Sequence, residues 1–275
     1  MNALAETGTG DITDRDVLGL WRRAYIKAPA ENPTHEDHDT RVYWFQAPDL
    51  YADLRVPAEF ASGFGGASLK DLDTDTLFRL GKCEGFAGIS TVEDSVCTWR
   101  RFINLQGPEE GKDIGRLCPA PDGMYEYGVE ADFVELWQND PARSAGIRAE
   151  IYSDGDGRIA ILVHSATHFL FACDRPERTR RVTTFQVELA DALICPNPQT
   201  DLLNTLFEAE YSFGHLHSGA AVIDLSTLPT RVGDCLFEDV PVSGDPLRTN
   251  HRSFDGLPYQ RQWHKVARDR LPELL

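Results

Sequence analysis

Apolar and polar residues alternate along much of the chain with the two-residue period of strands that are buried on one side. In residues 50–56, for example, Tyr51, Asp53 and Arg55 alternate with apolar residues, so a strand here has one polar and one apolar face. Turn sequences rich in Gly, Asp and Pro separate the alternating runs. The pattern predicts a mainly β protein.

Helical spacing of apolar residues is confined to three short segments, residues 69–80, 201–210 and 261–274. Residues 182–188 follow the strand pattern, and the polar, proline-containing residues 27–39 predict an exposed loop. We therefore expect only a few short helices, placed at the open ends of a sheet structure.

Several segments of the chain resemble one another in the same order. Residues 16–21 match residues 132–137 without a gap, and residues 42–57 match residues 161–176 in pattern. Each of the two longer segments predicts a β-hairpin, because two β-rich runs flank a short polar centre and a proline follows.

A third, looser match joins residues 85–101 to residues 212–227. Three matches in one order are what a duplicated unit with loop insertions gives, although β-rich segments also resemble one another by chance. On this basis residues 1–130 form a first β unit and residues 131–275 a second, which ends in a helix.

The composition is that of an ordinary globular protein, with 275 residues of which 41% are hydrophobic and 26% charged. A formal charge of −17 repels phosphate backbones and anionic lipids, so we expect neither a nucleic-acid nor a membrane partner. The sequence has no basic and apolar leader and no apolar run of membrane length, which favours a cytoplasmic protein.

Cysteine spacing and motif content argue against several common classes. The six cysteines are scattered without a C-x-x-C pair, so neither a zinc framework nor a disulfide scaffold is predicted. The sequence also lacks a nucleophile elbow, a phosphate-binding glycine loop, a dinucleotide fingerprint and an H-E-x-x-H motif. What remains is a ligand-binding β protein, or an enzyme that uses acid/base side chains without an organic cofactor.

Two histidines flank the centre of the second predicted hairpin. His164 ends one run and His168 begins the next, so a tight turn would bring the two imidazoles together. A neutral imidazole can take or give a proton near pH 7, which makes this pair the first candidate for acid/base catalysis. A histidine beside a turn can equally be solvated or bonded to a backbone carbonyl.

His215 and His217 share one face of a strand in the sequence His-Leu-His. Together with His164 or His168 they could form a three-histidine metal site. Because H-x-H is common by chance and no carboxylate partner is fixed by spacing, a metal-dependent enzyme is an alternative and not the first hypothesis.

Carboxylates and aromatic residues supply the remaining candidates. Glu135 and Glu188 are the carboxylates that we expect to point inward and to assist catalysis. Aromatic side chains beside arginine can hold an anionic or aromatic ligand, although core packing explains tryptophans equally well. The expected substrate-binding residues are Trp44, Tyr51, Trp99, Arg101 and Phe171.

The motifs in residues 16–21, 44–57 and 133–138 resemble those of the fungal Hri family, which also has bacterial relatives. The resemblance implies two tandem lipocalin-like, or calycin-like, antiparallel β-barrels that contain cavities. It supplies no catalytic residues for this chain, so a functional hypothesis has to come from the residues themselves.

Repeated strand pairs must close or pack to hide their edges, so we expect an all-β protein of two such barrels, or one merged barrel of the same strands, with a few short helices. The first functional hypothesis is a cofactor-independent lyase, dehydratase or isomerase acting on a small apolar or aromatic metabolite. We place its chemistry in the second unit. The alternative from another class is a non-catalytic carrier or sensor of a hydrophobic ligand, and a homodimer is compatible with both.

Overall fold

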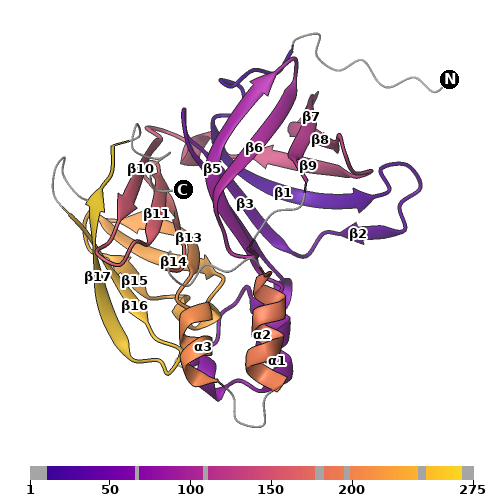
Figure 1. The fold of residues 1–275 in the computed structure, drawn as a ribbon. Helices are drawn as coiled ribbons and strands as arrows, with labels where there is room; N and C mark the ends of the chain where they lie inside the picture. Colours follow the sequence, from indigo (N-terminus) through magenta and orange to yellow (C-terminus); the bar gives the residue numbers. More distant parts are fainter. Residues whose placement is uncertain are drawn as a thin grey trace.

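Two antiparallel β-sheets, each curled into a barrel, form most of the computed structural model, as the alternating pattern predicts (Figure 1). The structure describes residues 11–65, 68–107, 111–176, 183–194, 199–240 and 246–267. No helix in these ranges is long and apolar enough to cross a membrane.

The first barrel consists of eight strands in sequence order, closed by pairing between its first and last strands, and one short strand attached to the rim. Closure matters because it leaves the eight strands without a free edge. The strands are β1 (Gly19–Ala28), β2 (His35–Asp37), β3 (Arg41–Gln46), β4 (Tyr51–Val56), β5 (Glu84–Glu93), β6 (Val96–Asn104), β7 (Asp113–Ala120), β8 (Gly123–Gly128) and β9 (Val134–Asn139).

The second barrel is closed less completely. Its last strand pairs with its first at only two positions, and Asn250 Nδ2 joins β16 to β15 by donating a 3.1 Å hydrogen bond to the carbonyl oxygen of Cys235. The strands are β10 (Arg148–Ser153), β11 (Ile159–His164), β12 (His168–Cys173), β13 (Glu210–His217), β14 (Ala220–Ser226), β15 (Cys235–Phe237), β16 (Leu247–Arg252) and β17 (Pro258–Lys265).

Within the described residues, three short α-helices gather at one end of the two barrels, at the bottom of Figure 1. They are α1 (Thr74–Leu80), α2 (Phe185–Ile194) and α3 (Thr200–Leu206), and the 3₁₀ turns are η1 (Ala58–Phe60), η2 (Leu69–Asp71), η3 (Pro141–Arg143) and η5 (Pro229–Arg231). The helix predicted at 69–80 is confirmed as η2 followed by α1. The helix predicted at 201–210 ends at Leu206, because Glu210 already belongs to β13.

Two predicted elements are wrong. Residues 185–188 begin helix α2 instead of a strand, because Phe185, Leu189 and Ala192 face the core at helical spacing. The first residues of the helix predicted at 261–274 belong instead to strand β17, because pairing with β16 overrides the helical spacing of apolar residues. Residues 268–275 lie outside the described residues.

The strand orders of the two barrels match, which supports the predicted duplication. In each barrel the helical insertion follows the third strand, and the next hairpin carries a bulge at a glycine, Gly88 in the first barrel and Gly214 in the second. A Cβ at either glycine would lie 1.9 Å from a carbonyl oxygen across the strand, so only glycine fits. The two hairpins predicted at 42–57 and 161–176 are equivalent, β3–β4 and β11–β12.

The details of the predicted repeat need two corrections. Residues 16–21 and 132–137 are not equivalent, because they lead into β1 and β9, which are neighbours in the same barrel. Val134–Asn139 therefore completes the first barrel, and the boundary falls after Asn139 instead of after residue 130.

The predicted match of the hairpins is also shifted by one residue. Tyr51 pairs with the bulge residue Gly88, and Phe169 pairs with Gly214, so Phe169 is the equivalent of Tyr51. A shift of one residue exchanges the two faces of a strand, so residues predicted to correspond lie on opposite faces.

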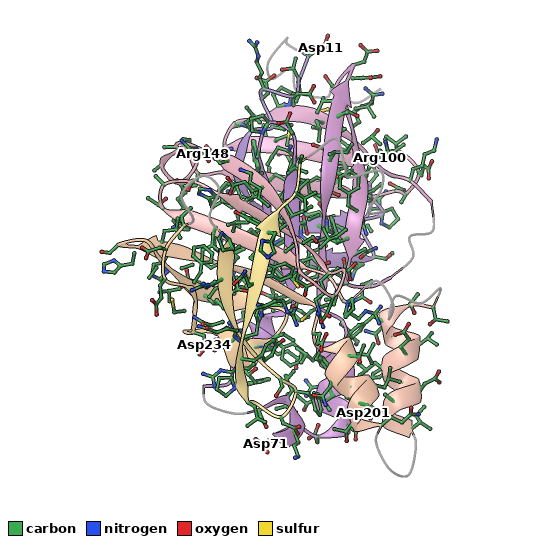
Figure 2. All side chains as sticks on the ribbon, turned by 60° about the vertical axis from the view of Figure 1, so that its left-hand side comes forward. Asp11, Asp71, Arg100, Arg148, Asp201 and Asp234 are labelled. Carbon is green, nitrogen blue, oxygen red and sulfur yellow. The ribbon has the colours of Figure 1, made fainter. Side chains whose placement is uncertain are left out.

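Buried apolar residues form three cores. One fills the first barrel and one fills the second. The largest lies between the barrels, where the outer faces of β3 and β4 pack against those of β11 and β12 and against the helices. Figure 2 shows the side chains that fill these spaces. Because this core is shared, each barrel buries the outer face of the other.

Candidate functional site

We call the interior of the first barrel the first lumen. Tryptophan side chains fill one half of it. Trp44 lies at the centre, and its ring centroid is 6.1 Å from that of Trp21, 5.5 Å from that of Trp99 and 5.7 Å from that of Trp137. These rings come from β3, β1, β6 and β9 and are almost completely buried. Their packed rings form an aromatic surface that borders the other half of the first lumen.

The other half of the first lumen contains a cluster of charged side chains. On several strands the charged residue lies two positions from an aromatic one, as in Trp21 and Arg23 or Trp99 and Arg101, so both point inward. We call this set the charged cluster, and it consists of Arg23, Asp53, Arg55, Arg101, Asp113, Glu126 and Glu135.

Ion pairs hold most of the charged cluster together. Arg23 lies 2.7 Å from Glu135 and 3.0 Å from Asp37 on the rim strand β2. Arg55 Nε donates to Asp53 at 2.9 Å, and Arg101 donates to Asp113 at 2.6 Å. The carboxylates nevertheless outnumber the guanidinium groups, which leaves Glu126 without a cationic partner among the described residues.

Glu126 faces another glutamate. It is paired directly with Glu135 across β8 and β9, and it accepts a 2.9 Å hydrogen bond from Trp137 Nε1. Burial and the neighbouring Glu135 raise the pKa of Glu126 well above its ordinary value. Glu126 therefore holds a proton more strongly than an ordinary glutamate, beside Glu135, which is paired with Arg23.

Asp53 is the second carboxyl group with a perturbed affinity for protons. Burial raises its pKa to about 6, although the Arg55 guanidinium opposes the shift. A group with this pKa exchanges its proton close to neutral pH. The charged cluster thus holds two carboxyl groups whose affinity for protons is raised, as in acid/base sites.

The charged cluster reaches the surface through two arginines. The guanidinium carbons of Arg101 and Arg55 lie 3.7 and 5.0 Å from the centroid of the Phe86 ring. Their side chains are 20% and 25% exposed, whereas Asp53 and Glu126 beneath them are 3% and 5% exposed. The two arginines therefore lie nearer the surface than the two carboxyl groups.

The interior of the second barrel, the second lumen, is apolar at three positions that are equivalent to members of the charged cluster. Phe171 replaces Asp53, Cys173 replaces Arg55, and Ile223 replaces Arg101. The second lumen therefore lacks the charged cluster among its described residues.

The polar residues of the second lumen form a separate network around Glu210. This carboxylate accepts hydrogen bonds from Arg231 at 3.0 Å, from His251 Nδ1 at 2.7 Å and from Ser212 at 2.8 Å. Although burial acts in the opposite direction, Arg231 and His251 lower the pKa of Glu210 to about 2. Since Glu210, Arg231 and His251 are at most 3% exposed, this network stabilises the barrel and offers no access to a ligand.

The two histidines predicted as an acid/base pair lie on opposite faces of the second barrel. His164 shares a face of β11 with Leu162, which lines the second lumen. His168 shares a face of β12 with Leu170, which packs between the barrels, and stacks on Phe213 with a centroid distance of 5.8 Å. The hairpin brings their backbones close, but the alternation of side chains separates their imidazoles.

The histidines considered as metal ligands do not assemble either. His168 and His215 are cross-strand partners, but His164 points to the opposite face, and His215 is bonded to Asp224 at 2.9 Å. Among the described residues, no group of three or more His, Cys, Asp or Glu side chains is placed to hold a metal ion.

Most of the other candidates converge on the first lumen. Trp44, Tyr51, Trp99, Arg101 and Glu135 all point into it, whereas Phe171 lines the second lumen. Glu188 lies on α2, where it is buried in an ion pair of 2.6 Å with Arg175. It has a structural role outside both lumens.

The sequence analysis did not select Asp53 or Glu126. Asp53 was visible as a polar residue within an alternating strand, but the pattern does not say which face of a strand lines a lumen. Glu126 lies two residues from Met124, so the two side chains share a face of β8. The apolar side chain of Met124 was the signal in the sequence that this face is buried.

Comparisons with known proteins leave the family of this chain open. No family model matches, and no curated protein matches. Among solved structures, an uncharacterised protein from Saccharomyces cerevisiae aligns over 90% of this chain and 97% of its own, with 12% sequence identity and a TM-score of 0.47.

Proposed function

We propose that the first lumen binds a small organic molecule and transfers protons to and from it, as a lyase, dehydratase or isomerase does. The observation that supports this best is the pairing of Glu126 with Glu135, two buried carboxyl groups on neighbouring strands of which one is charge-compensated by Arg23. Burying such a pair costs stability, and a site with a function explains why the cost persists.

In this proposal Glu126 is the proton donor and Asp53 the proton acceptor. Burial and Glu135 raise the pKa of Glu126 and so favour its protonated form, whereas a pKa of about 6 leaves Asp53 mostly ionised at pH 7. Glu135 has a positioning role, because it sets the protonation of Glu126 and is itself held by Arg23. Arg55 and Arg101 would bind the negatively charged or electron-rich part of the substrate.

The aromatic half of the first lumen defines the rest of the substrate. A ligand that reaches the carboxyl groups lies against the aromatic surface of Phe86, Tyr51 and the tryptophans. This surface favours a small molecule with an apolar or aromatic body and an anionic or carbonyl group at one end. The proposed chemistry requires only proton transfer, as in the lyase, dehydratase or isomerase expected from the sequence. The proposed site, however, lies in the first unit and not in the second.

Protein-dependent exchange of hydrogen for deuterium tests the proposal. Native mass spectrometry of the purified chain identifies any co-purified ligand, and this ligand, together with a panel of small carbonyl compounds and hydroxy acids, is incubated with the protein in D₂O. We expect deuterium to enter one C–H position of the true substrate or its analogue. Glu126→Gln and Asp53→Asn should each lower the rate at least about 100-fold, because each removes a proton-transfer group.

Neighbouring arginines provide a matched control. Arg101→Gln should weaken ligand binding, whereas Arg100→Gln should not, because Arg100 is exposed on the outer face of the same strand (Figure 2). Circular dichroism establishes that each variant is folded. Binding that depends on Arg101 without deuterium exchange would identify a carrier, and binding that is indifferent to Arg101 would rule out the first lumen as the site.

A further inference from the structure

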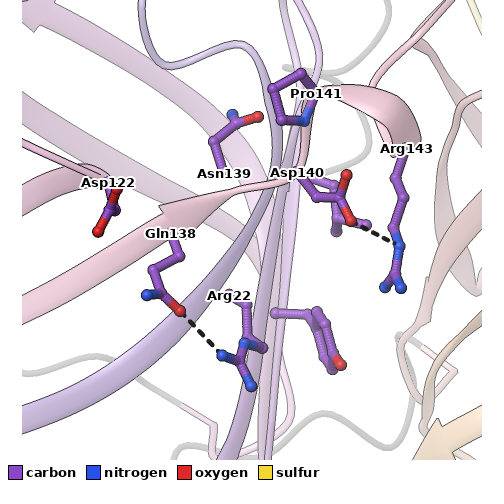
Figure 3. A pocket seen from close by; sticks show the side chains of 9 residues that line it. Arg22, Asp122, Gln138, Asn139, Asp140, Pro141 and Arg143 are labelled. Atoms are coloured by element: carbon purple, nitrogen blue, oxygen red, sulfur yellow. Dashed lines mark hydrogen bonds and ion pairs between the residues drawn. The ribbon is translucent and has the colours of Figure 1, made fainter.

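A pocket lies outside both lumens, at the junction of the two barrels (Figure 3). Its volume is about 500 Å³, which is within the range of small-molecule sites. It is formed where β1 and β9 close the first barrel and where η3 begins the connection to the second. We call it the junction pocket.

The closure of the first barrel aligns three side chains along one wall of the junction pocket. Arg22 is paired with Tyr43 across β1 and β3 and with Gln138 across β1 and β9, so the three form a row on the outer face of the sheet. Arg22 donates a 2.9 Å hydrogen bond to Gln138 Oε1. The row fixes the Arg22 guanidinium at the pocket.

A second guanidinium comes from η3. Arg143 Nε lies 2.8 Å from Oδ2 of Asp140. The other carboxylate oxygen of Asp140 accepts a hydrogen bond from the backbone nitrogen of Ala142. Pro141 at the start of this turn limits its conformational freedom. In Figure 3 the guanidinium groups of Arg22 and Arg143 point to the same side of the pocket, away from Pro141.

Both guanidinium groups keep donors available. Arg22 uses one nitrogen on Gln138, and Arg143 uses Nε on Asp140. Within the part of the chain that the structure describes, no acceptor lies within hydrogen-bond distance of their other N–H groups. Both arginines line the same pocket, and a guanidinium group is suited to a carboxylate or phosphate because it can donate two parallel hydrogen bonds.

The apolar part of the pocket is rigid. The Tyr43 ring stacks on Phe213 of the second barrel with a centroid distance of 4.0 Å and an interplanar angle of 13°, and Phe213 stacks in turn on His168. Leu20 is buried beside it. A flat or apolar ligand body can therefore pack against a surface that is already ordered.

Charge limits what the junction pocket can accept. The carboxylates of Asp122 and Asp140 balance Arg22 and Arg143, and the whole chain has a net charge of −17. This negative field repels a dianion such as phosphate about twice as strongly as it repels a single carboxylate. We propose that the junction pocket binds a small organic monocarboxylate through Arg22 and Arg143, with its apolar body against Tyr43.

Benzoate, acetate and inorganic phosphate are the probes that test the proposal on the full chain, with binding followed by NMR chemical shifts. We expect benzoate to bind saturably and more tightly than acetate, which lacks an apolar body, and more tightly than phosphate. Arg22→Gln and Arg143→Gln should each weaken benzoate binding about tenfold, the loss that corresponds to one charge-assisted hydrogen bond. Arg248→Gln, which changes an exposed arginine on β16, is the matched control.

His168 provides a second readout. Burial and the nearby Arg143 lower its pKa, with His215 acting in the same direction and Asp224 and Asp140 in the opposite one. A carboxylate bound to Arg143 should raise the pKa of His168. In Arg143→Gln this pKa should already be raised without benzoate and should not change when benzoate is added.

Three outcomes would overturn the proposal. Benzoate shifts that do not saturate, or that are equal in wild type and both arginine variants, would show that the pocket is not a carboxylate site. Phosphate binding that is tighter than benzoate binding and depends on both arginines would replace the monocarboxylate with a phosphate ligand. Benzoate binding that leaves the pKa of His168 unchanged would place the carboxylate away from Arg143.

Discussion

The two barrels share a strand order, a bulge glycine and the position of their helical insertion, but they place charge differently. The first lumen combines the aromatic surface of its tryptophans with the charged cluster, in which Glu126 and Asp53 have raised pKa values. The second lumen has apolar residues in place of Asp53, Arg55 and Arg101, and its Glu210 has a lowered pKa because Arg231 and His251 oppose the effect of burial. The two copies thus share a backbone fold but differ in their carboxyl groups. Those of the first barrel have raised pKa values, whereas Glu210 of the second barrel has a lowered pKa.

This contrast is opposite to the asymmetry expected from the sequence, which placed the chemistry in the second unit because that unit holds the histidines. Histidine content proved a poor guide, since His164 and His168 point to opposite faces and His251 is buried in an ion-pair network. Protein stability and proton binding offer ways to test the contrast.

The largest effect is expected in the Glu210 network of the second lumen. Arg231→Met should lower the free energy of unfolding by about 3–5 kcal/mol, because it leaves Glu210 as a buried charge without its main partner. Urea denaturation measures the effect. Arg252→Gln removes a more exposed arginine from Asp234 and should cost less than about 1 kcal/mol. Equal losses in the two variants would contradict the assignment of Glu210 as a buried, compensated charge.

The next effect concerns the pH dependence of stability. The folded-state pKa of Asp53 is raised from 3.8 to about 6, so its contribution to stability is fully present below pH 3.8 and is lost as the pH rises through 6. At about 1.4 kcal/mol per pH unit, ionisation of Asp53 should cost the folded state about 3 kcal/mol by pH 7. Asp53→Asn should therefore gain about this much relative to wild type between pH 4 and pH 7 in urea titrations.

Glu210 provides the opposite case for the same experiment. Its folded-state pKa is lowered to about 2, so its contribution is present above pH 4.5 and is lost as the pH falls towards 2. A fall in pH should thus lower the free energy of unfolding through Glu210 of the second barrel, but not through Asp53 of the first barrel. A stability difference between wild type and Asp53→Asn that stays constant from pH 4 to pH 7 would refute the raised pKa of Asp53.

A smaller effect should be shared by the two barrels. Gly88→Ala and Gly214→Ala place a methyl group 1.9 Å from the carbonyl oxygens of Arg100 and Val222, so each should cost about 2 kcal/mol. Gly155→Ala is the control, because the space around Gly155 is open. Thermal unfolding followed by circular dichroism compares the three variants. A large loss in only one barrel would argue against structural equivalence of the two bulges.

The smallest expected effect tests whether the histidines of the second barrel act together. Because His164 and His168 point to opposite faces, the costs of His164→Gln and His168→Gln should add in the double variant to within about 0.5 kcal/mol. Denaturation of the two single variants and the double variant measures this. A coupling above about 1 kcal/mol would restore them as a pair.

The sequence predicted the fold because its information is local and repeated. Period-two alternation identified the strands, and short polar centres located both hairpins. The choice of aromatic residues beside arginine selected Trp44, Tyr51, Trp99 and Arg101, which line the first lumen. What alternation cannot say is which face of a strand points inward, since the pattern is the same from either side.

The remaining errors have the same physical origin. Closure of a barrel joins strands that are far apart in sequence, so the pairing of β1 with β9 left no local signal, and Val134–Asn139 was assigned to the wrong unit. Glu126 and Glu135 become partners only through the register of β8 and β9. A functional site assembled by closure is therefore less visible in a sequence than one built within a single motif.

The core between the barrels has an evolutionary consequence. Equivalent strands meet there, since β4 packs against β12 and β3 against β11. Each half of the duplication therefore has its outer face fixed by the other half, whereas its interior touches only its own strands. Divergence between the two copies is accordingly found in their interiors.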